Sequence, residues 1–268
     1  MTGREALIAI ALKYQGDWDK MVAAVKAHEE FGSEEAEKSV ASLKCKCVTL
    51  IDPDYPDSLK HCFRPPLVLF YKGDLSLAQN ESRCVAYIGA RNASAYGLRT
   101  ADAIAGGLAK EGLVIVTGLA MGIDHEATKA ALDAGGKAIG VLGCGLDVCF
   151  PDSSRDVYDR LTKDGLLISE YPLDVPPSPD NFPKRNRIVA ALSHGLVVGE
   201  ASKRSGTLIT VGYALGFTKE IGCVPYPADE DSACNILIKE GASLIENVDD
   251  VNMMLDFKPS TSEKPAEK

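Results

Sequence analysis

Glycine-rich segments that directly follow short apolar runs constrain the fold of this chain most strongly. They span Gly89 to Ser94, Gly118 to Asp124 and Gly143 to Asp147. Glycine is typical of the tight turn between a strand and a helix, and in an open parallel sheet such turns line the carboxyl edge, where ligands bind. Each following helix presents unpaired N–H groups and a positive dipole end. Together these junctions predict a binding site for a chain of phosphates.

A simpler interpretation exists for each junction taken alone, because glycine also serves an ordinary tight turn. The phosphate interpretation depends on their occurring together and on Arg91, which lies in the first of them. None has the full G-x-G-x-x-G spacing, so no dinucleotide cofactor is expected.

The rest of the chain from residue 45 onward alternates between β-branched runs and helical patterns, which is typical of βαβ units. Strands are expected at residues 46–51, 68–71, 84–88, 113–117, 138–142, 166–169, 196–199 and 221–224. The spacing of Ala101, Ile104, Ala105 and Leu108 predicts one of the helices between them. We therefore predict an α/β fold for residues 45–256, with an extended Rossmann-like, mostly parallel sheet flanked by helices.

The two ends of the chain have different patterns. Residues 1–44 predict a small N-terminal helical appendage of two or three short helices, with a stop and restart at Gly32 to Glu35. Residues 257–268 lack apolar anchors and are expected to form a disordered tail. No signal peptide is recognisable, and no apolar run approaches the roughly 18 residues of a membrane span. We therefore expect a cytoplasmic protein with no membrane contact.

Charge and cysteine usage exclude several classes of protein. The net charge of −9 argues against a protein that coats nucleic acid indiscriminately, so any polyanion site must be local. The 8 cysteines form no C-x-x-C pair, and we expect reduced core thiols with no metal site. Asp124, His125 and Glu126 are adjacent at a helix start and point in different directions, so they are poorly placed to bind the same metal ion.

A basic segment at residues 181–188 offers groups that single-stranded nucleic acid would use. Phe182 supplies a ring on which a base can stack, and Asn186 supplies an amide for a base edge. Lys184, Arg185 and Arg187 supply cations for phosphate. The alternative is a solvated helix start with Pro183 in its first turn.

A further helix start follows at residues 202–210. Ser205 or Thr207 is expected to cap it, while free N–H groups near Gly206 bind phosphate. Ordinary capping is compatible with that role.

Taken in order, these segments resemble the DNA-processing protein A (DprA/Smf) family. The matching stretches are Ile88 to Arg91, Thr117 to Asp124, Val141 to Asp147 with Phe150 and Pro151, Ser169 to Pro172, Phe182 to Ile188, and Val198 to Thr210. The resemblance spans roughly residues 45 to 250 and is to a variant without the C-terminal winged-helix domain found in many members. The chain departs from the family pattern at Thr128, where many members have histidine, and at Tyr226, which follows Val-Pro in place of glycine.

The resemblance implies a homodimer that binds single-stranded DNA, protects it, and helps to load the RecA recombinase in natural transformation or homologous recombination. It implies no cofactor and no catalytic residue. Carried over by position, the DNA-binding residues are Gly89, Arg91, Gly118, Gly122, Asp124, Phe182, Arg185, Asn186, Arg187, Ser205, Gly206 and Thr207. Arg91, Arg185 and Arg187 are the expected phosphate clamps, and Asp124 is expected to orient its loop.

Two alternatives share the same pocket. One is a sensor that binds a nucleotide or nucleotide derivative, and the other is a hydrolase that cleaves the N-glycosidic bond of a nucleotide. The hydrolases have an acidic residue after their glycine-rich phosphate loop, whereas no glutamate follows Ser205 to Thr207. Glu170 and Glu200 lie at strand ends, where a cap or a pocket rim is the expected role.

Overall fold

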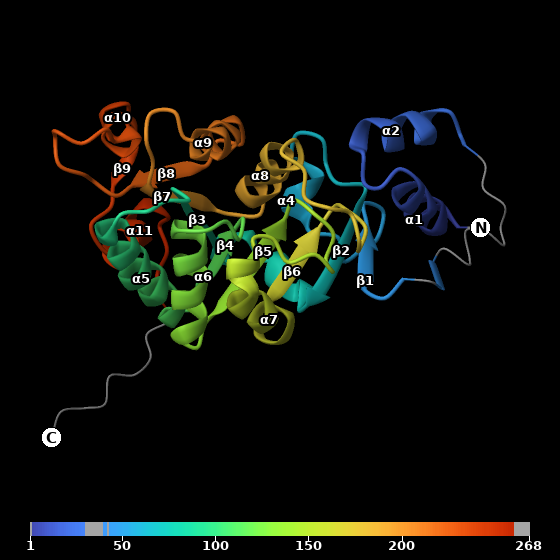
Figure 1. Ribbon diagram of the computed structural model, residues 1–268, viewed down its shortest axis with the longest axis horizontal. Coiled ribbons are helices and arrows are strands. Elements are labelled where there is room, and N and C mark those ends of the chain that lie inside the picture. The colour runs from blue at the N-terminus through green and yellow to red at the C-terminus, as the bar shows by residue number, and fades with distance from the viewer. Residues whose placement is uncertain (1, 30–39, 42, 260–268) are drawn as a thin grey trace, which may run out of the picture.

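A computed structural model describes residues 2–29, 40–41 and 43–259, and its strands form one sheet with helices on both faces (Figure 1). The strand order is β1-β2-β6-β5-β4-β3-β7-β8-β9. The strands are β1 (Lys46–Thr49), β2 (Val68–Gly73), β3 (Cys84–Gly89), β4 (Val114–Thr117), β5 (Lys137–Leu142), β6 (Leu166–Ser169), β7 (Gly195–Glu200), β8 (Glu220–Cys223) and β9 (Ser243–Leu244). β2 pairs antiparallel with β1 and β6, and all other neighbours are parallel. The predicted α/β class with a mostly parallel sheet is confirmed.

The central strands form because their residues are continuously apolar, as strands covered on both faces require. Every residue of β4 and β6 is buried. The predicted first strand was too long, because the Asp52 carboxylate accepts the Thr49 N–H at 2.9 Å and a turn begins there. β9 was not predicted, since two residues give no periodicity.

The helices divide between the two faces of the sheet (Figure 1). One face packs against α5 (Ala95–Lys110), α6 (Ile123–Asp133), α7 (Arg155–Asp164) and α11 (Val248–Met254), and the other against α4 (Asp57–Lys60), α8 (Asn181–Ala191), α9 (Thr207–Gly216) and α10 (Ala233–Lys239). The predicted inward residues of α5, Ala101, Ile104, Ala105 and Leu108, are at most 2% exposed. In the described segments, no helix combines the length and apolar character needed to cross a bilayer.

The N-terminal helices α1 (Gly3–Lys13) and α2 (Trp18–Lys26) lie at the β1 end of the sheet (Figure 1). They share a core with the sheet, because Ile10 and Met21 belong to the same buried cluster as Phe70 of β2. Gly16 joins them at φ +76°, and a Cβ there would lie 2.5 Å from the Glu170 carbonyl oxygen. The boundary predicted at residue 44 stays a prediction. The restart predicted at residues 32–35, and residues 260–268 of the predicted tail, lie outside the described residues.

The direction of strand order reverses between β3 and β7. From β3 the chain adds β4, β5 and β6 on one side, whereas β7, β8 and β9 continue on the other. In open α/β sheets the turns on either side of such a reversal diverge and leave a crevice at the carboxyl ends of the strands. The fold therefore directs a ligand to the ends of β3 and β7.

Candidate functional site

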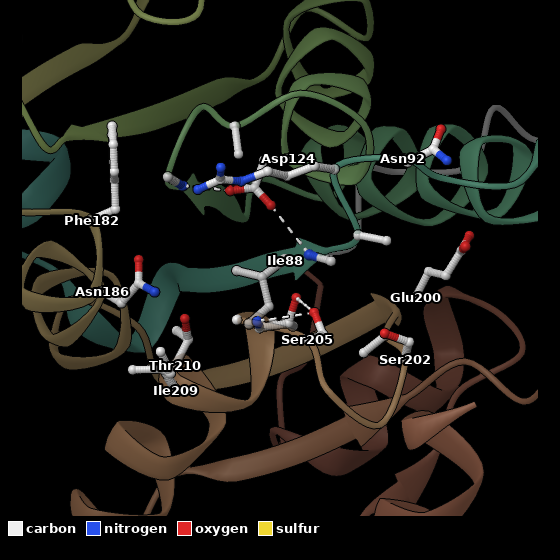
Figure 2. A pocket seen from close by; sticks show the side chains of 18 of the residues that line it. Ile88, Asn92, Asp124, Phe182, Asn186, Glu200, Ser202, Ser205, Ile209 and Thr210 are labelled. Atoms are coloured by element: carbon white, nitrogen blue, oxygen red, sulfur yellow. Dashed lines mark hydrogen bonds between the residues drawn. The ribbon is translucent and has the colours of Figure 1, made fainter. Parts of the chain in front are cut away.

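A cavity of about 920 Å³ lies at these strand ends. Figure 2 shows residues that line it, drawn from β3, the turns after β3 and β4, and the first turns of α8 and α9. The predicted site residues among its lining are Gly89, Arg91, Gly118, Asp124, Phe182, Arg185, Asn186, Ser205, Gly206 and Thr207. Gly122, Lys184 and Arg187 lie outside this wall. Segments far apart in the sequence are thus brought together as predicted.

Asp124 joins the first two glycine-rich turns. Its buried carboxylate accepts the N–H of Gly89 at 3.2 Å and of Gly118 at 2.9 Å. Burial raises the pKa of Asp124, and the Arg185 charge and these two N–H groups oppose that rise. The bonds tie the carboxylate to both turns, and the role of Asp124 in orienting its loop stays a prediction. Because the carboxylate holds both turns, it fixes how far apart the backbones of the turns stand.

Arg185, which was predicted as a phosphate clamp, supports the same wall from α8 through bonds to the protein backbone. Its side chain is buried, and Nη1 donates to the carbonyl oxygens of Gly118, at 2.5 Å, and Val141. Burial lowers its pKa to about 10, and the Asp124 carboxylate opposes that change. The helical period places residue 185 on the same inward face as Ile188 and Val189, which the prediction did not consider.

Arg187 was predicted as a phosphate clamp, and the structure contradicts this. Its Nη1 and Nη2 donate to the two carboxylate oxygens of Glu170 at 2.8 and 2.7 Å, and its side chain is 3% exposed. Nε donates to the Arg64 carbonyl oxygen at 3.0 Å. Burial lowers the pKa of Arg187, but the Glu170 carboxylate outweighs it and the net shift is upward. The guanidinium is held by four hydrogen bonds inside the protein, and it lies outside the wall of the main cavity.

Arg91 is the exposed cation of the cavity, and it lies beside two aromatic rings. Its guanidinium carbon is 5.6 Å from the centroid of the Phe182 ring. Phe182 in turn stacks on Phe150 with centroids 5.5 Å apart and an interplanar angle of 27°. Phe150 is 44% exposed, so a ring remains available beside the cation. Phe150 belongs to one of the stretches that carry the family resemblance, but the sequence does not predict it as a site residue.

Carboxylates also line the cavity. The Glu200 carboxylate accepts Ser94 N–H at 2.9 Å, Ser94 Oγ–H at 2.8 Å and the Tyr226 hydroxyl at 3.1 Å. Glu200 therefore holds the start of α5, as its predicted rim position allowed. Glu230 and Asp231 also line the cavity, and Asp231 pairs with Lys203 at 2.9 Å. Tyr226, a departure from the family pattern, is a lining residue that the sequence does not predict.

The start of α9 forms a third part of the wall. Gly206 occupies the N-cap position, so neither Ser205 nor Thr207 caps the helix as predicted. Ser205 Oγ accepts the Thr207 N–H at 3.1 Å and donates to Thr207 Oγ1 at 2.8 Å. A Cβ at Gly206 would meet no atom within 4 Å, so the cavity is open at this turn.

Metal-binding chemistry has no assembled ligand set in the described residues, where no group of three or more His, Cys, Asp or Glu side chains is arranged to hold an ion. His125, next to Asp124 in the sequence, instead pairs with Asp156 of α7 at 3.0 Å.

Comparisons with known proteins show the family of this chain. Residues 46–256 match the family model described as DNA recombination-mediator protein A. The chain is 40% identical to Protein Smf of Synechocystis sp. over 198 residues, which cover 72% of this chain and 50% of that protein. It is 38% identical to the DNA processing protein DprA of Streptococcus pneumoniae over 236 residues, covering 87% and 83% respectively. The chain therefore spans about half the length of the Synechocystis relative.

Two solved structures are similar over most of the fold. The X-ray structure of DNA processing protein A from Streptococcus pneumoniae has a TM-score of 0.75 at 31% identity, covering 96% of this chain and 94% of that one. The structure of DNA processing protein A from Helicobacter pylori, which concerns its single-stranded DNA binding mode, has a TM-score of 0.72 at 30% identity, covering 80% and 99%.

Proposed function

Because this chain belongs to the DNA recombination-mediator protein A family, which includes the DprA and Smf proteins, we propose that it binds single-stranded DNA in the cavity at the ends of β3 and β7. The observation that carries the proposal is the exposed Arg91 guanidinium beside the stacked rings of Phe182 and Phe150. A single strand offers phosphates and unpaired bases together, and cations with aromatic faces are the groups that bind them.

The electrostatics of the whole chain fit a local site. A net charge of −9 repels DNA over most of the surface. A strand is therefore held only where a cation and ring faces coincide, and the strand backbone should pass over Arg91 and away from Glu230 and Asp231.

The biological role that we propose follows from the family. The protein protects incoming or exposed single-stranded DNA and helps to load the RecA recombinase during natural transformation or homologous recombination, and it acts as a homodimer. We propose binding rather than catalysis, since Glu200 already accepts hydrogen bonds from Ser94 and Tyr226.

A second candidate is a nucleotide or nucleotide derivative as the natural ligand. The cavity volume of about 920 Å³ favours it, because sites for small molecules span roughly 300–1,000 Å³. Strand length distinguishes the two. A strand gains affinity with length and loses it with salt, and a mononucleotide does neither strongly.

The test is fluorescence anisotropy of a labelled poly-dT strand at several lengths and salt concentrations. Arg91→Ala is expected to raise Kd about tenfold and to lower the slope of log Kd against log salt by roughly one, as loss of one phosphate contact does. Arg83→Ala is the matched control, because Arg83 is exposed and precedes β3, at the opposite end of that strand.

Equal weakening by both variants would assign the effect to net charge alone. No binding by the native protein at any length in low salt would overturn the DNA proposal, and nucleotide binding would then be tested first.

A further inference from the structure

A second cavity, of about 240 Å³, lies across α8 from the main one, and we name it the Trp18 cavity. From the start of α8, Phe182, Arg185 and Asn186 line the main cavity, whereas Asn181, Lys184 and Arg187 line the Trp18 cavity. This division follows from the helix, since successive residues point about 100° apart. In Figure 1, α8 lies between α9 and α2, and α2 begins with Trp18. The two cavities therefore share the first turns of α8 as a common wall.

The aromatic side of the Trp18 cavity is fixed in place. Trp18 Nε1 donates to the Pro65 carbonyl oxygen at 2.9 Å, and the Arg64 guanidinium carbon is 4.9 Å from the centroid of the Trp18 ring. Arg64 also pairs with Asp19 at 2.8 Å. The Arg64 backbone has φ +54°, and the Arg64 carbonyl oxygen accepts the hydrogen bond from Arg187 Nε. The loop that presents this arginine is thus tied to the buried Arg187–Glu170 pair.

Phe63, the residue before Arg64, is 59% exposed at the rim of the same cavity. The Arg64 guanidinium lies 5.6 Å from its ring centroid. An exposed ring beside a cation is the arrangement that stacks a base and attracts its phosphate.

The charged side chains of the Trp18 cavity favour an anion. Four cations, Lys20, Arg64, Lys184 and Arg187, and two carboxylates, Asp17 and Glu170, line it. Three of the cations already have partners, since Arg187 pairs with Glu170, Lys20 with Asp17 at 3.4 Å, and Arg64 with Asp19, so Lys184 is the cation left to meet a phosphate. Lys184 is exposed on the wall shared with the main cavity, so its charge faces solvent where a phosphate can approach.

We propose that the Trp18 cavity is a second nucleotide subsite, which receives a base on Phe63 and a phosphate at Lys184 from the strand that leaves the main cavity across the start of α8. The volume suits one base, because sites for whole small-molecule ligands begin at roughly 300 Å³. The subsite rests on the proposed function and gives the bound strand a path toward the N-terminal helices.

Trp18 makes the subsite directly observable, because it is the only tryptophan of the chain. A poly-dT strand of about 20 nucleotides should reach both cavities, and one of about 4 nucleotides should occupy only the main one. On addition of the long strand we expect the tryptophan fluorescence of the native protein to change with the same Kd as the anisotropy. The short strand should leave it unchanged.

Variants of the rim separate stacking from charge. Phe63→Ala should raise Kd for the long strand about tenfold, the effect of losing one stacked base, and leave Kd for the short strand unchanged. Phe63→Tyr should restore the native value, because its ring also stacks. Lys184→Ala should lower the salt slope for the long strand by roughly one. Phe63 and Lys184 are exposed, so urea unfolding of the variants should match the native protein.

Other outcomes overturn the subsite in different ways. If the long strand binds with the expected dependence on Arg91 but changes neither Trp18 fluorescence nor the Kd of Phe63→Ala, the subsite is wrong and the main cavity stands. If thymidine monophosphate alone changes the fluorescence as tightly as the long strand, the cavity binds free nucleotide and the strand path is wrong. If no strand binds the native protein, the proposed function fails and the subsite fails with it.

Discussion

The guanidinium groups of Arg91, Arg185 and Arg187 have different surroundings, and we therefore expect the three arginines to have different roles. Arg91 is exposed beside an aromatic ring, Arg185 donates to the carbonyl oxygens of Gly118 and of Val141 in β5, and Arg187 pairs with Glu170. In the sequence, the basic run at residues 184–187 makes both of its arginines equally good candidates for phosphate contacts. Both arginines of the run are buried, and the helical period directs Arg185 toward the main cavity and Arg187 toward Glu170, which follows β6 and lies outside the run.

The first prediction at this scale concerns Arg187. Arg187→Ala should lower the free energy of unfolding by about 3–5 kcal/mol, because it leaves the Glu170 carboxylate buried without its partner. The folded fraction should still bind a short poly-dT strand with native Kd, since Arg187 lies outside the main cavity wall. Urea unfolding followed by anisotropy in the absence of urea measures both quantities.

Arg160→Ala is the control for that experiment. It removes an arginine paired with Asp133 at 2.6 Å whose side chain is 36% exposed, and exposed pairs contribute less than about 1 kcal/mol. Native stability of Arg187→Ala together with weaker binding of the short strand would restore Arg187 as a direct phosphate contact.

Among the elements, the turns after β3 and β4 define the main cavity, and their packing depends on a glycine. Gly122 is the N-cap of α6 at φ +76°, and a Cβ there would lie 2.6 Å from the Arg91 carbonyl oxygen and still closer to that of Ala90. Gly122 does not line the cavity, but it controls where the turn that contains Arg91 stands.

Gly122→Ala should therefore weaken binding of a short poly-dT strand at least as much as Arg91→Ala and destabilise the fold by about 3 kcal/mol, because both the backbone conformation and the turn are strained. Gly206→Ala is the matched control at a helix start. Gly206 lines the cavity, its φ is not positive, and a Cβ added there would meet no atom within 4 Å. Native Kd in Gly122→Ala would show that the Arg91 turn tolerates displacement.

The sequence predicts the strands of this fold well because buried parallel strands are continuously apolar. It also places the glycine-rich turns at one edge, since parallel strands share a direction. It does not predict that β2 pairs antiparallel with β6, because no residue of β2 differs in kind from those of a parallel strand. It misses Phe150 and Tyr226 because their positions in the wall follow from loops without periodicity.

On the scale of the whole molecule, a net charge of −9 must be reconciled with binding of a polyanion. The lining of the cavity carries charges of both signs, with Arg91 beside the rings and with Glu230 and Asp231, of which Asp231 pairs with Lys203 at 2.9 Å. The screening length is about 10 Å at 0.1 M salt, so distant acidic residues act weakly and those on the cavity wall act strongly. The local wall, more than the total charge, should set the affinity.

Replacement of two acidic residues tests this. Glu230→Gln with Asp231→Asn should lower Kd for a long poly-dT strand about three- to fivefold in low salt, an effect that fades as salt rises, because exposed charges a few ångströms from a phosphate interact by about 1 kcal/mol in water. The control, Asp164→Asn with Glu220→Gln, makes the same change in net charge at exposed residues beside the amino ends of β6 and β8. Anisotropy at low and high salt measures both. Equal tightening by the two pairs would mean that total charge governs binding, and an unchanged Kd in the first pair would mean that the strand does not approach Glu230 and Asp231.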